Sequence, residues 1–205
     1  MLCSASLDRK YINPNVELPY NFSTEALNAA VAKTYKVFHG LNFYLANSDQ
    51  RSLEKMLLAN TLSGMISEML VKHISDCSET LIKNVKTGGH PDLLPTGMYA
   101  EPSIHRGNHG LEIKASQHSG GWQGHNPETG WLMIFCYDIE DMNSLRFTEI
   151  LCAYLDESDW NFSGRSSESR RTPTASINKE GLKKLRNNCV YRIPGFGVGK
   201  YKVQE

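Results

Sequence analysis

Two acidic residues and a lysine stand out because their spacing suits metal-assisted hydrolysis. Asp92 follows Pro91, and after an interval of 19 residues Glu112 and Lys114 lie on either side of Ile113. Carboxylate oxygens are the ligands that Mg²⁺ prefers, and the ion keeps waters and substrate phosphate oxygens beside them. A lysine so close can orient the attacking water and offset the charge that grows on a phosphate. These residue types predict hydrolysis of phosphodiester bonds.

The stretch over residues 111–115 alternates between apolar and charged residues, as a β-strand does. Its odd-numbered residues are apolar and share one face, whereas Glu112 and Lys114 share the other. The interval before Glu112 is long enough for the chain to return beside itself, so that Asp92 and Glu112 converge. The alternative is a surface strand whose charges are merely solvated, with Asp92 in a turn.

Pro91-Asp92, followed by Glu112-Ile113-Lys114, resembles the motif of the PD-(D/E)xK nuclease superfamily, and most closely that of its type II restriction endonucleases. The resemblance rests on these five residues and on a compatible order of elements over residues 50–155. It implies a mixed central β-sheet flanked by helices. It also implies dependence on Mg²⁺, for which Mn²⁺ substitutes, and a homodimer acting on double-stranded DNA.

The same resemblance implies a role for each site residue. Asp92, Glu112 and the carbonyl of Ile113 would hold the metal ion, and Lys114 would orient or activate the water. Members of the superfamily often place an acidic residue on the preceding helix, which suggests Glu68 as a further catalytic residue. For Glu68 an ordinary exposed glutamate is an equally open interpretation.

Two polar segments that follow the candidate strand carry side chains suited to reading DNA. Arg forms paired hydrogen bonds with guanine, and Asn or Gln does so with adenine. Contacts with phosphates alone, or a plain polar loop, are the alternatives. The candidate DNA-binding residues are Gln123, His125, Asn126, Arg165, Arg170 and Arg171.

The formal net charge of the 205 residues is zero, but the charges are segregated. Residues 138–159 carry seven acidic residues and one basic, or −6, and residues 165–200 carry nine basic and two acidic, or +7. The basic segment is a candidate surface for phosphates, although two distant solvated surfaces would give the same pattern.

The length predicts one domain over residues 1–205. Within it we expect a mainly helical part over 1–75, a catalytic sheet over 88–155 and a basic part over 156–205. Apolar periodicity predicts helices from about residue 24 to 38, ending near Gly40, and from about 48 to 74, with a short basic helix over 178–187. The predicted fold is α/β, with a mixed sheet, flanking helices and an N-terminal helical segment.

Other patterns narrow the range of functions. Five cysteines without CxxC spacing favour a reducing, cytoplasmic setting, and no apolar stretch approaches the ~18 residues that cross a bilayer, so no membrane partner is expected. The histidines match no usual zinc-finger spacing. Two alternatives to a restriction-type enzyme stay open: a structure-selective nuclease of recombination or repair, and a non-catalytic DNA-binding module.

Overall fold

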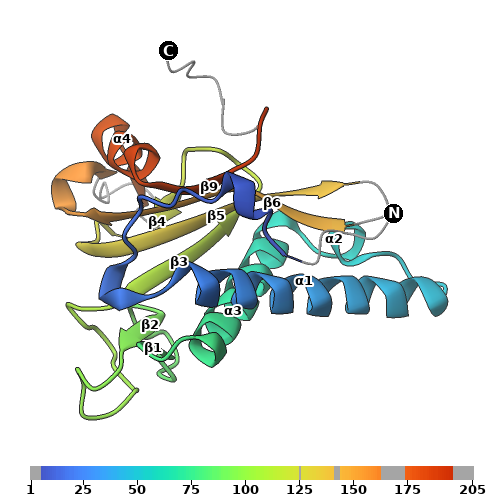
Figure 1. Ribbon diagram of the computed structural model, residues 1–205, viewed down its shortest axis with the longest axis horizontal. Helices are drawn as coiled ribbons and strands as arrows, with labels where there is room; N and C mark the ends of the chain where they lie inside the picture. The colour runs from blue at the N-terminus through green and yellow to red at the C-terminus, as the bar shows by residue number, and fades with distance from the viewer. Residues whose placement is uncertain (1–5, 125, 141–143, 163–173, 196–205) are drawn as a thin grey trace, which may run out of the picture.

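A mixed β-sheet with helices on both faces forms the body of the protein. The computed structural model describes residues 6–124, 126–140, 144–162 and 174–195. Helices α1 (Thr24–Asn47) and α3 (Ala59–Cys77) cover one face of the sheet, and α4 (Lys179–Asn187) lies on the other (Figure 1). The predicted α/β class with a mixed sheet and an N-terminal helical segment is confirmed.

The main sheet has six strands in the order β1-β2-β3-β5-β6-β9. Among the described residues of this sheet, β3 and β5 pair in parallel and the other strand pairs are antiparallel. The parallel pair requires a crossover, which the chain makes through residues 117–129. The strands are β1 (Leu81–Lys83), β2 (Leu93–Pro95), β3 (Leu111–Ser116), β5 (Gly130–Glu140), β6 (Ser144–Leu155) and β9 (Cys189–Arg192).

Two apolar cores lie on opposite faces of this sheet. The first joins α1 and α3 to the odd-numbered residues of β3. The second lies toward α4 and a three-stranded sheet of β4 (Gln123–Gly124), β8 (Ala175–Ile177) and β7 (Trp160–Phe162). Glu112 pairs with Leu132, and Lys114 pairs with Ile134, in the register of β3 and β5. Because Leu132 and Ile134 belong to the second core, Glu112 and Lys114 share that face, as the alternation predicts.

Helix α1 begins as predicted but ends later. The Ser23 hydroxyl accepts a hydrogen bond from the Ala26 N–H at 3.1 Å and caps the first turn. The expected end near Gly40 is wrong, because the helix continues to Asn47. An exposed glycine inside a helix costs only about 1 kcal/mol. Asn42, two residues later, is buried, and its Oδ1 accepts a hydrogen bond from the Leu53 N–H at 2.9 Å.

The second predicted helix, over 48–74, is in fact two helices. A short helix α2 (Leu53–Met56) precedes α3, and Leu57 and Leu58 between them are extended. The apolar stripe runs on through this break, so periodicity could not reveal it. The predicted cap of α4 is present: Asn178 Oδ1 accepts from the N–H groups of Glu180 and Gly181 at 2.9 and 3.0 Å.

None of the helices in the described part of the chain combines the length and the apolar character that a bilayer crossing needs.

Candidate active site

Asp92 and Glu112 lie next to the residue pair that joins β2 to β3. That pair is Leu93 with Leu111, and Asp92 and Glu112 are the adjoining residues on the side of the site. The Asp92 carboxylate also accepts a hydrogen bond from the Ile113 N–H, at 2.9 Å from N to Oδ2. The chain between Asp92 and Glu112 therefore returns beside itself through this antiparallel contact.

After Leu111, the backbone N–H groups on this side of β3 donate to side chains and no longer to β2. Asp92 accepts from Ile113, and the Ser67 hydroxyl on α3 accepts from the Ala115 N–H at 2.8 Å. In an extended strand the N–H and C=O of one residue point to the same side. The Ile113 carbonyl therefore faces the edge on which Asp92 lies, where the resemblance places a metal ligand.

Asn84 fixes the segment that carries Asp92, and no motif or spacing singles this residue out in the sequence. Its N–H donates to the Asp92 carbonyl at 2.8 Å, and its side-chain amide donates to the carbonyls of Pro91 and Ile104 at 3.0 and 2.8 Å. Asn84 Oδ1 in turn accepts from the Ile104 N–H at 3.1 Å. With 6% of its surface exposed, this one amide replaces a strand partner for the loop around Asp92.

Gly110 allows β3 to begin against Pro91. Its φ is +148°, and a Cβ at this position would overlap the Pro91 ring and the Leu93 carbonyl. The Gly110 N–H donates to the Tyr20 hydroxyl at 2.8 Å, which holds the start of the strand from the N-terminal side. Only glycine satisfies both the backbone angle and the close approach.

The electrostatics of the acidic pair are asymmetric. Burial, and then the negative charge of Glu112, raise the pKa of Asp92 to about 7. Burial also raises the pKa of Glu112, but His90 and Lys114 together outweigh it, so the net shift is downward. Lys114 Nζ lies 3.9 Å from Glu112 Oε1. Glu112 is thus the ionised member, and Asp92 holds its proton longer.

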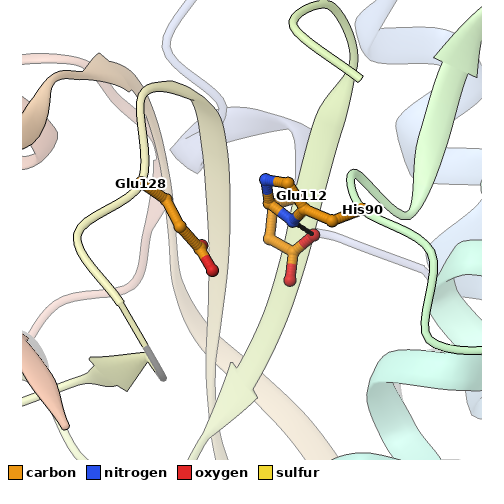
Figure 2. Close-up of side chains that lie close together, drawn as sticks. All are labelled: His90, Glu112 and Glu128. Carbon is orange, nitrogen blue, oxygen red and sulfur yellow. Dashed lines mark ion pairs between the residues drawn. The ribbon is translucent and has the colours of Figure 1, made fainter. Parts of the chain in front are cut away.

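A second group of ligand atoms includes Glu112 but not Asp92. The ligand atoms of His90, Glu112 and Glu128 all lie within 4.8 Å of one another (Figure 2). His90 Nδ1 is 3.0 Å from Glu112 Oε2, and this contact with Glu112 raises the pKa of His90. Oε2 is buried, and apart from this contact it has no hydrogen-bond donor among the described residues. Neither His90 nor Glu128 was a predicted site residue.

Glu68 lies near Asp92 as the partner of a lysine. Its Oε2 is 2.8 Å from Lys83 Nζ, and 70% of its side chain is exposed. Glu68, Lys83 and Asp92 line one hollow of the surface. The resemblance implied an acidic helix residue close to the metal, and the structure places Glu68 beside Asp92, already paired with Lys83.

Of the predicted DNA-binding residues, Gln123 shares a groove with Lys114. Gln123 is exposed on β4, and the groove between them is lined on its other side by residues of α3. The neighbouring Trp122 is buried, and its Nε1 donates to the His118 carbonyl at 3.0 Å, which fixes the loop. Asn126 is exposed. His125, Arg165, Arg170 and Arg171 lie outside the described residues.

The predicted residues thus meet around one stretch of β3 but line three hollows. Asp92 lines the hollow with Glu68, and Glu112 lines the one with His90 and Glu128. Lys114 lines the groove that leads to Gln123. Asp92 and Glu112 thus lie beside the same stretch of backbone, but their side chains line different hollows.

Fold alone does not determine activity, so chemistry has to be argued from these side chains. Comparison with protein-family models, with curated proteins and with solved structures finds no match to this chain.

Proposed function

We propose that the protein is a Mg²⁺-dependent, sequence-specific endonuclease that hydrolyses phosphodiester bonds of double-stranded DNA, in the manner of a type II restriction enzyme. The observation that carries the proposal is the 2.9 Å hydrogen bond from the Ile113 N–H to Asp92 Oδ2, which ties Asp92 to the residue between Glu112 and Lys114, with Lys114 Nζ 3.9 Å from Glu112 Oε1. Three residues of the required types, separated along the chain, therefore lie on β3 or directly beside it.

The residues present fit a divalent cation. The charge of Glu112 raises the pKa of Asp92, so the two carboxylates repel each other, and the Ile113 carbonyl faces the side on which Asp92 lies. Asp92, Glu112 and the Ile113 carbonyl are oxygen donors that would hold Mg²⁺. The ion supplies Lewis acidity and neutralises charge on the phosphate. Mn²⁺, which accepts the same oxygen ligands, would substitute.

Lys114 would act on the water and on the phosphate. Its ammonium has three donors and no acceptor, so it can hold a water by the oxygen and leave the nucleophilic lone pair directed at phosphorus. The nearby Glu112 carboxylate keeps this side chain against the strand. The positive charge of Lys114 also favours the transition state, in which negative charge gathers on the phosphate oxygens.

The groove supports a DNA substrate. It runs from Lys114 to the exposed Gln123, whose amide has the paired donor and acceptor that adenine recognition uses. Asn126 lies exposed three residues beyond Gln123 and offers the same chemistry. One such site cuts one strand, so cleavage of both strands calls for two copies of the chain, and we propose a homodimer.

Incubation of the purified protein with plasmid DNA and Mg²⁺ tests this function. Discrete fragments whose ends share one sequence are expected, and EDTA should abolish them. Cleavage confined to branched or flapped DNA would instead indicate a structure-selective nuclease. Binding without any nicking would indicate a DNA-binding module. Asp92→Ala and Lys114→Ala should both be inactive, and retained cleavage in either variant would defeat the assignment.

A further inference from the structure

His90, Glu112 and Glu128 come from three separate parts of the chain and meet at one point. Glu112 is on β3, His90 is in the loop before β2, and Glu128 is in the crossover before β5. Their side chains project into the same space between the strand and the two loops (Figure 2). With one ligand atom from each, all the ligand atoms lie within 4.8 Å of one another.

The two loop residues are held in place by their backbones. The His90 N–H donates to the His105 carbonyl at 3.2 Å, and the His90 carbonyl accepts from the Gly107 N–H at 2.8 Å. The Glu128 carbonyl accepts a hydrogen bond from Trp160 Nε1 at 2.9 Å. The three side chains therefore start from fixed positions, which lowers the entropy lost when they bind an ion together.

Two further observations point to a ligand at this cluster. The three residues line a single hollow, whose wall also includes the apolar side chains of Leu132 and Trp160. Glu112 Oε2 is buried there, and apart from its 3.0 Å contact with His90 Nδ1, itself a proposed ligand, it has no hydrogen-bond donor among the described residues. A buried carboxylate oxygen without a donor costs free energy unless a cation lies against it.

We propose that His90, Glu112 and Glu128 bind a divalent transition-metal ion such as Zn²⁺, Co²⁺ or Mn²⁺. An imidazole nitrogen beside carboxylates favours these ions, whereas Mg²⁺ and Ca²⁺ prefer all-oxygen ligands. Three protein ligands leave coordination positions for water or substrate. The site shares Glu112 with the proposed nuclease centre but uses neither Asp92 nor Lys114, so it does not rest on that function.

Titration of the full chain with Co²⁺ after treatment with EDTA tests the site, with binding followed by visible absorption and by calorimetry. His90→Gln and Glu128→Gln should each weaken Co²⁺ binding by about tenfold or more. The exposed His105 and Glu101 offer matched controls, and His105→Gln and Glu101→Gln should bind like the wild type. Asp92→Asn should also retain the site.

Equal Co²⁺ affinity in the wild type and in both ligand variants would overturn the proposal, as would a loss confined to Asp92→Asn. Circular dichroism and thermal unfolding show whether each variant folds. A folded variant should also lose the rise in melting temperature that Co²⁺ gives the wild type. If the wild type binds Co²⁺ but does not cleave DNA, the nuclease proposal fails and the transition-metal site stands. If the wild type cleaves DNA but Glu128→Gln binds Co²⁺ as tightly as the wild type does, the transition-metal site fails and the nuclease proposal stands.

Discussion

The Asp92 carboxylate accepts a hydrogen bond from the Ile113 N–H at 2.9 Å, which joins the loop before β2 directly to the centre of β3. The bond stabilises the ionised carboxylate and so opposes the effects of burial and of Glu112 on its pKa. It also holds Asp92 at the edge that the Ile113 carbonyl faces. One acidic side chain thus serves as a strand partner and as a candidate metal ligand.

The first prediction concerns the pH dependence of stability in the metal-free protein. Folding raises the pKa of Asp92 from 3.8 to about 7, so between these values the folded state binds more protons than the unfolded state. Stability is therefore lost as pH rises from 3.8 toward 7, on the order of 2–4 kcal/mol from this residue. Urea unfolding in EDTA across this range measures the slope.

The matched variant is Asp92→Asn, which retains the shape of the side chain but cannot ionise. It should unfold at higher urea concentration than the wild type above pH 7 and lose the slope assigned to Asp92. Addition of Mg²⁺ should stabilise the wild type and not the variant. Equal slopes for the wild type and Asp92→Asn between pH 3.8 and 7 would show that the pKa of Asp92 is not raised by its surroundings.

The second prediction separates catalysis from folding at Lys114. Lys114→Ala removes an ammonium from the edge of the groove without opening the core, because its side chain is partly exposed. DNA cleavage should fall by about 100-fold or more while the unfolding midpoint changes little. Lys72→Ala, which alters an exposed lysine paired with Asp76 on α3, is the control and should cleave normally. Steady-state cleavage and urea unfolding give the two measurements.

The third prediction tests Asn84 as the residue that positions Asp92. Asn84→Ala leaves the carbonyls of Pro91 and Ile104 without their buried donor. The free energy of unfolding should fall by roughly 2–4 kcal/mol. The exposed Asn15 supplies the control, and Asn15→Ala should change it little. Equal stability of the two variants would mean that the loop around Asp92 is held by other contacts.

Local patterns predicted the parts of the fold that local physics decides. Strict alternation placed Glu112 and Lys114 on one face of β3, and the capping side chains marked the starts of α1 and α4. The class followed from the order of helices and strands. The end of α1 and the break before α3 were not predictable, because the tertiary hydrogen bond between Asn42 and Leu53 supports them.

The site was only partly predictable for the same reason. Asp92, Glu112 and Lys114 belong to a short motif with a chemical meaning, so their types and spacing could be recognised. Glu128 lies in a polar crossover and His90 immediately before Pro91, and nothing in their spacing joins them. They meet because β3 and β5 pair in parallel, which brings the crossover back beside the strand. Such contacts follow from strand pairing across the sheet.

The last prediction concerns recognition of the DNA sequence. Gln123 is exposed in the groove that also contains Lys114, and the buried Trp122 holds its backbone. Gln123→Ala should therefore leave the fold and metal binding intact but cost about 1–3 kcal/mol at the base pair that the amide reads. Cleavage of the preferred site should slow, and cleavage at sites that differ in that base pair should change little.

The exposed Gln117 lies in the same crossover but not among the residues that line the groove. Gln117→Ala is therefore the matched control, and it should retain the full preference of the wild type. Competition between oligonucleotides that differ at single positions gives the specificity ratio directly. If Gln123→Ala weakens cleavage of every sequence equally, Gln123 contacts the phosphate backbone, because only a contact with a base edge produces a loss confined to one position.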